Sequence, residues 1–426
     1  MTEEENETAE GRNSRKEHPR ILLISNFFPP HVKGGAELAC AHLAEWLTRK
    51  GYPVAVMTLA PPGASDSIED SPDGYRIFRM RIPNVYHTYV HDRVPAWKKP
   101  FWHLIDQRNP FSRKALDEVI SEFRPDVVNT HNLQGMGYNL WALLGKANLP
   151  VLVTLHDPSV VCIRSSMFRN GETCTRLCRS CDLSRRVKKS YLESIEKVTF
   201  ASPSRALLSI LGRYLPPNCV EARHLPNPLG FKRKQLTARK HDCVELLYVG
   251  QISTHKGVEF LLSVLEEMKP EGRFRLTLLG RGSLLDPLRT RFSGKEWVRF
   301  EGFVAPEKVS GQMAESDVLL IPSLWVENAP LVAMEAIGLG LPMITSSKGG
   351  LPELVEHEVT GLILEAGNRV EWKEALSNLA GNREMITKWK GNALHRRREF
   401  DVDLLGERYL ALVRRTIEGR RQHIPG

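Results

Sequence analysis

At 426 residues, the chain is longer than a single hydrophobic core usually organises, so two domains are expected. Hydrophobic residues make up 42% of it and charged residues 26%, as in soluble globular proteins, and no apolar run is long enough to form a transmembrane helix. The formal net charge of +9 favours anionic partners such as phosphorylated ligands or acidic lipids, whereas nucleic acid is disfavoured because no zinc-finger, helix-turn-helix or RRM-like motif is present.

The first segment, residues 1–18, is polar and acid-rich, which predicts a disordered tail rather than a signal peptide or a membrane anchor. We therefore expect the protein in the cytoplasm. Residues 19–228 are predicted to form an N-terminal α/β domain, because short apolar strands alternate there with helical patterns.

This domain opens with a βαβ unit, in which an apolar strand at Ile21–Ser25 is followed by a helix from about Ala36 to Lys50 and a second strand at Val54–Leu59. The loop before the helix contains Gly34-Gly35. Two glycines allow a backbone to come close to a ligand, but the loop matches neither GxGxxG nor a P-loop and also fits a plain tight turn.

The segment Val85–Lys114 mixes aromatic with basic side chains. This composition suits a surface that meets anionic lipid, which would place the protein peripherally on the inner face of the cell membrane. The alternative is an irregular loop and helix that pack on the sheet. The residues concerned are Tyr86, Tyr89, Trp97, Phe101, Trp102 and Phe111, with Arg93, Lys98, Lys99, Arg108, Arg113 and Lys114.

Histidines stand at the ends of two further predicted strands, His131 after Asp126–Thr130 and His156 after Val151–Leu155. Ligands of open α/β sheets lie beyond the carboxyl ends of the strands. Of the two, His156 has the stronger claim to a functional role, because the adjacent Asp157 could orient its ring.

A cysteine-rich loop follows, covering residues 162–181. Disulfides are rare in cytosolic proteins, so clustered thiols favour a metal, and four thiolates would form a closed structural zinc site. An iron–sulfur cluster and unligated thiols are the alternatives. The four candidate ligands are Cys162, Cys174, Cys178 and Cys181.

Residues 229–243 are basic and unpatterned, which predicts a linker to a second α/β domain over residues 244–395. In that domain glycine loops follow successive strands, at Gly250–Gly257 and at Gly280-Arg281-Gly282. Lys256 in the first loop can neutralise a phosphate as a point charge. Residues 396–426 form a final helical segment.

The segment Ile321–Ala336 reads as a buried strand, a polar elbow and a helix that begins around Pro330. The N–H groups of Leu331 and Val332 would have no intrahelical acceptor, so this helix start attracts anions. Carboxylates at Glu327 and Glu335 bracket it and would accept hydrogen bonds from sugar hydroxyls. A purely structural interpretation also exists, in which Glu327 caps the helix and Glu335 is solvated.

These motifs together resemble the family 4 glycosyltransferases, retaining enzymes of the GT-B fold with two Rossmann-like domains that face each other across a cleft. The resemblance runs from about Arg20 to Val413, and its most specific part is the E-x7-E element Glu327–Glu335 with its flanks. It implies that the final helix crosses back to the N-terminal domain, that the donor is a nucleotide-diphosphate sugar and that catalysis requires no metal.

The resemblance also implies roles for individual residues. Glu335 would bind the ribose, the amides of Leu331 and Val332 would hold the diphosphate with Lys256, and Glu327 would bind the donor sugar. His156 would approach that sugar from the other domain, and Gly35 would bring the first loop close to donor and acceptor. The implied catalytic residues are His156, Lys256 and Glu327, and the implied donor-binding residues are Gly35, Gln251, Gly282, Asn328, Ala329, Leu331, Val332 and Glu335.

One departure concerns Gln251, which stands where the family usually has arginine and so removes one positive charge from the diphosphate site. The expected function is transfer of a sugar, with retention, to a saccharide or lipid-linked saccharide in the synthesis of a cell-surface polysaccharide or glycolipid. The alternatives are a GT-B epimerase or phosphorylase, and a non-catalytic subunit that binds a nucleotide sugar.

Overall fold

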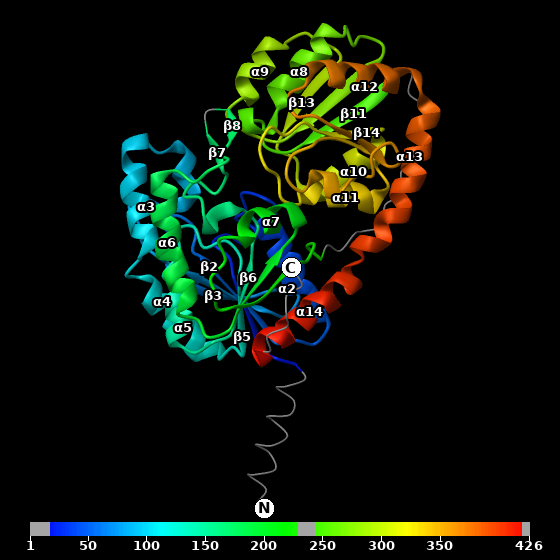
Figure 1. The fold of residues 1–426 in the computed structure, drawn as a ribbon. Helices are drawn as coiled ribbons and strands as arrows, with labels where there is room; N and C mark the ends of the chain where they lie inside the picture. Colours follow the sequence, from blue (N-terminus) through cyan, green and yellow to red (C-terminus); the bar gives the residue numbers. More distant parts are fainter. Residues whose placement is uncertain (1–17, 170, 229–242, 420–426) are drawn as a thin grey trace, which may run out of the picture.

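The computed structural model describes residues 18–169, 171–228 and 243–419. Most of the predicted tail and of the predicted linker therefore lies outside the described residues. The described chain forms two α/β domains, each built on a mainly parallel sheet with helices on both faces (Figure 1).

The sheet of the N-terminal domain has eight strands in the order β10-β9-β6-β5-β1-β2-β4-β3. All neighbours pair in parallel except β3, which is antiparallel to β4 at the edge. The strands are β1 (Ile21–Ile24), β2 (Val54–Leu59), β3 (Ser67–Asp70), β4 (Arg76–Met80), β5 (Val127–Thr130), β6 (Val151–Thr154), β9 (Val198–Ser202) and β10 (Cys219–His224), with a separate hairpin of β7 (Phe168–Arg169) and β8 (Glu172–Thr173).

Two hydrophobic clusters cover the two faces of this sheet. One contains side chains of α4 to α7, and the other contains α2 and the C-terminal helix α14. The helices are α2 (Gly35–Arg49), α3 (Lys99–Gln107), α4 (Ser112–Phe123), α5 (Leu140–Lys146), α6 (Arg179–Glu193) and α7 (Arg205–Gly212), with 3-10 turns η1 (Thr88–Arg93), η2 (Ala96–Lys98) and η3 (Pro158–Val160).

The C-terminal domain has six parallel strands in the order β13-β12-β11-β14-β15-β16. They are β11 (Val244–Val249), β12 (Phe274–Leu279), β13 (Val298–Gly302), β14 (Val318–Ile321), β15 (Met343–Ser346) and β16 (Gly361–Leu364). The helices are α8 (Val258–Glu267), α9 (Leu285–Arg291), α10 (Pro306–Glu315), α11 (Leu331–Leu339), α12 (Arg369–Gly381) and α13 (Arg383–Arg396), with η4 (Thr254–Lys256), η5 (Leu351–Glu353) and η6 (Arg397–Phe400).

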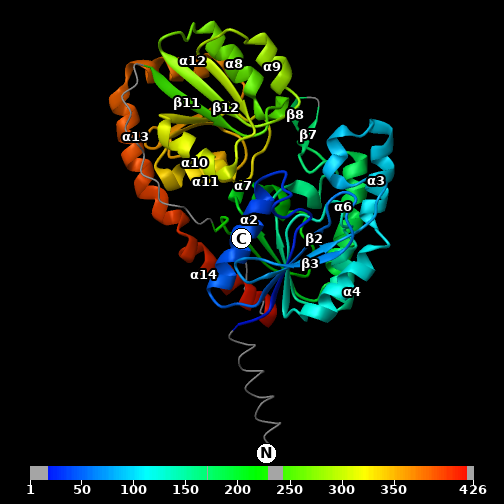
Figure 2. The same ribbon diagram turned by 180° about the vertical axis from the view of Figure 1, so that it is seen from behind.

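The last helix, α14 (Val402–Glu418), leaves the second domain and packs on the first (Figure 2). Asp401 caps its start by accepting hydrogen bonds from the Asp403 and Leu404 amides, as expected for an Asp before a helix. The Tyr409 hydroxyl lies 3.1 Å from Asn129 Oδ1 on β5, and the Trp46 indole of α2 donates to Asp403. The end of the chain therefore belongs to the core of the N-terminal domain.

Candidate active site

The elbow between β14 and α11 holds a buried carboxylate, that of Glu327, which is 6% exposed. Ser323, two residues after β14, donates a 2.5 Å hydrogen bond to its Oε1, and Lys256 Nζ lies 2.7 Å from the same oxygen. Burial alone would raise the pKa of Glu327, but the Lys256 ammonium and the hydrogen bonds lower it below its ordinary value. Glu327 is therefore ionised at neutral pH, and the simple role of helix cap does not describe it.

Lys256 is brought to the elbow by the close packing of two loops. Gly257 has a φ of +71°, and a Cβ there would collide with the Pro322 carbonyl oxygen, so only glycine fits this contact. The Leu324 amide donates to the His255 carbonyl at 2.9 Å. Lys256 Nζ then lies 4.6 Å from the centre of the Trp325 ring, between that ring and Glu327.

The next residue of the elbow, Asn328, connects the two domains. Its Nδ2 donates to the carbonyl oxygens of Leu155, at 2.9 Å, and of His156, at 3.0 Å. Its Oδ1 accepts a 2.7 Å hydrogen bond from Ser204 Oγ at the start of α7. The sequence interpretation placed Asn328 against the donor, whereas in the structure its side-chain amide is used between the domains.

A second contact between the domains lies beside it. Glu353 of η5 accepts hydrogen bonds from the backbone amides of Arg205, at 2.9 Å, and Ala206, at 2.8 Å, at the N-terminus of α7. Gly350 packs so closely that a Cβ would collide with the Asn328 carbonyl oxygen. The carboxyl ends of strands from both sheets therefore meet at Asn328.

His156 follows β6 at this meeting point, and its ring partner is the other predicted histidine. His131 Nδ1 lies 2.7 Å from His156 Nε2, and the two rings are stacked. Asp157 does not orient His156, because its carboxylate accepts the Ser159 amide and caps η3 instead. Burial lowers the pKa of His156 to about 4, so the ring is neutral at pH 7.

The N-termini of two helices lie together near these side chains. A Cβ on Gly35, the first residue of α2, would come within 3.0 Å of Leu331 Cγ at the start of α11. Pro330 immediately precedes α11 and its carbonyl accepts the Ala333 amide. The amides of Leu331 and Val332 have no acceptor among the described residues, which leaves two N–H groups for an anion.

Glu335 lies in the second turn of α11 and is partly buried. Burial raises its pKa from 4.5 to about 7, and no hydrogen-bond or ion-pair partner is present among the described residues. A freely solvated carboxylate would keep its ordinary pKa. Glu335 is thus an acceptor without a donor. Ala329, between the two acids, is buried in the cluster that contains Leu331.

The glycine loops after β11 and β12 pack on each other beside η4. A Cβ on Gly282 would collide with the Ile252 carbonyl oxygen, and Arg281 O accepts the Ile252 amide at 3.0 Å. Gln251 has an exposed side chain, and its carbonyl oxygen accepts the Tyr248 hydroxyl at 2.6 Å. The structure thus brings Gln251 and Gly282 into one pair of loops.

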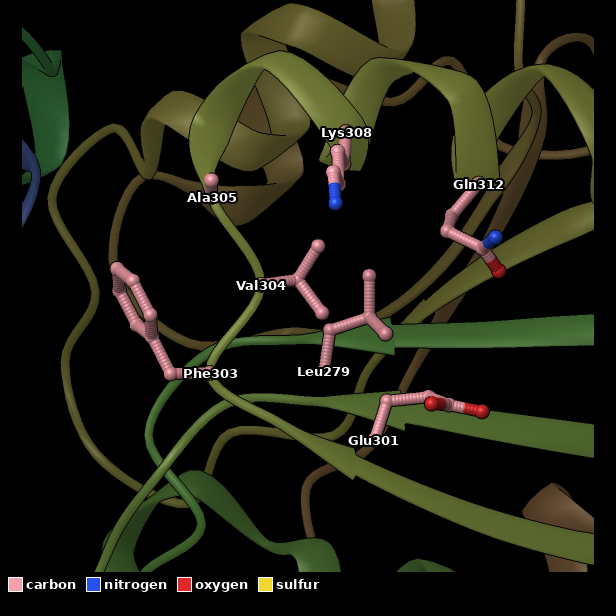
Figure 3. Close-up of a pocket in the computed structure, with 7 residues that line it drawn as sticks. All are labelled: Leu279, Glu301, Phe303, Val304, Ala305, Lys308 and Gln312. Carbon is pink, nitrogen blue, oxygen red and sulfur yellow. The ribbon is translucent and has the colours of Figure 1, made fainter.

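A cavity of about 370 Å³ lies at the ends of β12 and β13, under α10 (Figure 3). The Gly280 amide donates to the Gly302 carbonyl at 2.7 Å, so the cavity adjoins the second glycine loop. No motif pointed to it in the sequence. Its lining residues are Leu279, Glu301, Phe303, Val304, Ala305, Lys308 and Gln312.

The cysteine-rich loop does not form the predicted zinc site. Among the described residues, no group of three or more His, Cys, Asp or Glu side chains could hold a metal ion. Cys162 and Cys181 are buried with their sulfurs 4.0 Å apart, Cys178 is exposed at the start of α6, and Cys174 is half-buried beside β8. The described residues therefore do not assemble the four-thiolate site that the sequence predicted.

The same loop instead contributes to the contact between the domains. Its hairpin places the Phe168 ring 6.4 Å from the His255 ring, next to Lys256. His255 in turn packs 4.6 Å from Trp325. The loop therefore borders the elbow from the side of the N-terminal domain.

Sequence reasoning missed three contributors to this site, namely Ser323, Ser204 and Glu353. Ser204 and Glu353 contact residues more than 100 positions away, and Ser323 contacts Glu327 within the elbow, where no motif marks it. The only available signal was position, since Ser323 and Ser204 each stand two residues after a strand, β14 and β9, and Glu353 lies in η5 after β15. Small polar residues at strand ends of a parallel sheet are candidates for such roles.

Comparison with known proteins gives two family matches. A model described as Glycosyltransferase Family 4 matches residues 33–200, and one described as Glycosyl transferases group 1 matches residues 244–382. Together they cover more than two thirds of the chain.

Two relatives from Mycobacterium tuberculosis align over most of their length. Glycogen synthase is 28% identical over 80% of this chain and 81% of its own. The GDP-mannose-dependent alpha-(1-6)-phosphatidylinositol monomannoside mannosyltransferase is 25% identical over 88% of this chain and 96% of its own.

Solved structures agree in fold. Sucrose-phosphate synthase from Thermosynechococcus elongatus has a TM-score of 0.77 at 21% identity, covering 94% of this chain and all of that one. Anabaena HepE in complex with UDP-glucose has a TM-score of 0.65 at 17% identity, covering 93% and 99%. The predicted fold class, two Rossmann-like domains in the GT-B arrangement, is confirmed.

Proposed function

The chain belongs to the family 4 glycosyltransferases, and from this premise we propose that it transfers a sugar from a nucleotide-diphosphate donor to a saccharide or lipid-linked saccharide, with retention. The observation that carries the proposal is the start of α11. The first two amides of α11, the Lys256 ammonium and the carboxylates of Glu327 and Glu335 lie in the elbow, its neighbouring loop and the first two turns of α11.

The diphosphate of the donor would bind at the N-terminus of α11. The amides of Leu331 and Val332 would donate to its oxygens, and Lys256 would supply a positive charge. As the bond to the sugar breaks, charge builds up on the diphosphate, and fixed donors stabilise it without reorganising. Gln251 adds no charge here, so this stabilisation rests on Lys256 and the helix.

The ribose and the base of the nucleoside would lie on opposite sides of the second glycine loop. Glu335, which lacks a donor, would accept hydrogen bonds from the ribose hydroxyls as a carboxylate. The cavity beside Gly280 is the place for the base, because its wall combines apolar surface from Phe303 with polar ends from Lys308 and Gln312. Gly282 would keep the loop between them free of side-chain bulk.

The sugar would lie between the two domains. Glu327, ionised and held by Lys256 and Ser323, would accept hydrogen bonds from its hydroxyls. His156, neutral and linked to His131, would face it from the N-terminal domain as an uncharged hydrogen-bonding group. Gly35 at the start of α2 would leave space for donor and acceptor.

The kind of sugar and acceptor is inferred from relatives that differ among themselves. One relative is named as dependent on GDP-mannose and as acting on a phosphatidylinositol mannoside, while HepE was solved with UDP-glucose. We infer a hexose donor and a role in the synthesis of a polysaccharide or glycolipid, in the cytoplasm.

A thermal-shift panel tests the donor site. Nucleoside diphosphates and their hexose derivatives of uridine, guanosine and adenosine are compared on the wild type and on Glu335→Ala. We expect one nucleotide to stabilise the wild type and to lose most of its effect on the variant. If no nucleotide stabilises the wild type, or the variant responds equally, the donor site is wrongly assigned.

The donor identified in this panel is then used in a transfer assay, and the product is analysed by NMR. Retention requires that the new glycosidic bond keep the anomeric configuration of the donor. Release of an altered nucleotide sugar without acceptor would indicate an epimerase, and turnover only with inorganic phosphate would indicate a phosphorylase. Binding without any turnover would indicate a non-catalytic subunit.

A further inference from the structure

Helix α3 presents two very different faces. Trp102 and Asp106 are fully buried, and the Trp102 indole donates a 2.9 Å hydrogen bond to the Tyr86 carbonyl oxygen. Phe101 and Leu104 on the opposite face are 59% and 72% exposed. The helix is therefore fixed on the domain by one face while the other presents large apolar side chains to solvent.

The exposed face continues beyond α3. Trp97, one turn before Phe101, is 66% exposed, and Phe111 at the start of α4 is 52% exposed. Helix α6, which lies beside α3, exposes Leu183 to 66% next to Ser184, whose hydroxyl bonds to Gln107 at 3.1 Å. We call these exposed side chains, Trp97 of η2 with Phe101 and Leu104 of α3, the α3 face; Phe101 and Leu104 share one side of the helix at their spacing of three.

The charge around the α3 face is positive. Between residues 93 and 114 the only acidic residue is Asp106, and it is buried, where it accepts the Gly135 and Gly137 amides. Lys98 Nζ lies 5.2 Å from the centre of the Trp97 ring. The basic residues of this stretch are Arg93, Lys98, Lys99, Arg108, Arg113 and Lys114.

We propose that the α3 face docks on the surface of a bilayer that contains anionic phospholipid. Exposed Trp, Phe and Leu surrounded by Lys and Arg match the interfacial region of such a bilayer, where apolar side chains enter the acyl boundary and ammonium groups meet the phosphates. Among the described residues no helix is long and apolar enough to cross a membrane, so this contact would be made from one side.

The alternative from the sequence, in which this segment simply packs on the sheet, accounts for Trp102 but not for Phe101 and Leu104. A contact between two copies of the chain would bury the same apolar side chains, but it would also bring the basic groups together, and like charges repel. The lipid is the partner with complementary charge. Docking would also place a lipid-linked saccharide beside the N-terminal domain. This part of the inference, which concerns the acceptor, rests on the proposed function.

The test is sedimentation of the full chain with vesicles of phosphatidylcholine alone or with about 30% phosphatidylglycerol. We expect at least tenfold stronger partitioning to the anionic vesicles, weakened when salt rises from about 0.1 to about 0.5 M. The variant Trp97→Ser/Phe101→Ser/Leu104→Ser should lose at least tenfold of that partitioning. A matched control, Ile68→Ser/Val370→Ser, removes exposed apolar residues elsewhere and should bind like the wild type.

Three outcomes would overturn the proposal. They are equal binding of the triple variant, no binding of the wild type to anionic vesicles, and a dimer in light scattering that the triple variant abolishes. The donor-induced thermal shift is measured on the same preparations. If that shift is normal while vesicle binding fails, only the docking surface is wrong, whereas loss of the shift alone concerns the proposed function.

Discussion

Asn328 Nδ2 in the C-terminal domain donates a 3.0 Å hydrogen bond to the carbonyl oxygen of His156 in the N-terminal domain. The same Nδ2 also donates to the Leu155 carbonyl oxygen, and Asn328 Oδ1 accepts a hydrogen bond from Ser204 Oγ. A residue inside the E-x7-E element thus fixes the position of the histidine loop relative to Glu327. Together with the contact of Glu353 to the Arg205 and Ala206 amides, this side chain sets the distance between Glu327 and the His156 loop.

Asn328→Ala should therefore impair turnover more than donor binding. Three hydrogen bonds between the domains are lost, each worth about 1 kcal/mol in net terms. We expect kcat to fall about 10- to 100-fold, which corresponds to about 1.4 to 2.8 kcal/mol, while the donor Kd changes less than about threefold. Steady-state kinetics and calorimetric titration with the donor measure the two quantities.

Ser204→Ala is the matched control for this prediction. It removes one of the three hydrogen bonds from the other side of the interface, so its effect on kcat should be only a few-fold. If Asn328→Ala instead abolishes donor binding and leaves the kcat of bound donor unchanged, Asn328 contacts the donor as the sequence interpretation had it.

The pair of Lys256 and Glu327 predicts a strong coupling in stability. Lys256→Met leaves a buried carboxylate without its cation, and we expect a loss of about 2 to 3 kcal/mol in the free energy of unfolding. Glu327→Gln leaves the partly buried ammonium unpaired and should cost a similar amount. The double variant should cost clearly less than the sum, because neither charge then remains unpaired.

Chemical denaturation of the four proteins in this cycle measures the coupling. Lys295→Met, at an exposed lysine, is the control for loss of a lysine as such and should change the free energy of unfolding by less than about 0.5 kcal/mol. Additive effects of the two single variants would show that the ion pair does not stabilise the elbow.

The strands that could be predicted from the sequence are those buried on both faces. β1, β2 and β14 are continuous apolar runs, as expected in the middle of a parallel sheet. The sequence reading missed β3 and β4 because they break this pattern. All four residues of β3 are exposed at the sheet edge, and β4 buries Arg79, which pairs with Glu69 of β3.

At the site, the chemistry of single residues was predictable and their partners were not. The spacing of Glu327 and Glu335 and the free amides of α11 follow from local sequence. The pairing of Glu327 with Lys256 spans 71 residues, and that of Asn328 with Leu155 spans 173. Only the folded sheets bring these together, which is why the sequence could not show the contacts of Asn328 with the N-terminal domain, and why the His156 ring was expected to pair with Asp157 and not with His131.

The four cysteines should differ in their importance for stability. Cys162→Ser and Cys181→Ser place a hydroxyl in the buried pair and should each cost about 1 to 3 kcal/mol of unfolding free energy. Cys178→Ser, at an exposed position, should change it by less than about 0.5 kcal/mol. Similar losses at Cys178 and Cys181, together with stoichiometric metal by mass spectrometry, would contradict the arrangement described above.

Donor binding should become stronger as pH rises through 7. Burial raises the pKa of Glu335 to about 7, so at pH 6 most molecules carry the proton and at pH 8 most do not. In the proposed donor site the ribose hydroxyls would donate to the Glu335 carboxylate, so the carboxyl proton must leave before the donor binds in this way. We expect up to about tenfold tighter binding at pH 8 than at pH 6.

A nucleotide sugar is the correct probe for this titration, because its diphosphate, esterified at both ends, does not change charge between pH 6 and 8. Glu335→Gln should bind the donor weakly and with no such pH dependence. If the variant keeps the dependence of the wild type, another group is responsible for it.

The same shift predicts the opposite trend for the stability of the unliganded protein. The folded pKa of Glu335 exceeds the ordinary value of 4.5, so the folded state holds the proton more tightly than the unfolded state between pH 4.5 and 7. The contribution of Glu335 to the free energy of unfolding is fully present below pH 4.5, where the carboxyl is protonated in both states. It falls as the pH rises through 7, by up to about 3 kcal/mol in total. Glu335→Gln cannot ionise, so at pH 8 it should unfold at higher denaturant concentration than the wild type.

Equal midpoints at pH 8 would show that the carboxylate of the free enzyme is not held in an unfavourable environment. A higher midpoint combined with weaker donor binding would show that Glu335 destabilises the free protein and acts on the donor.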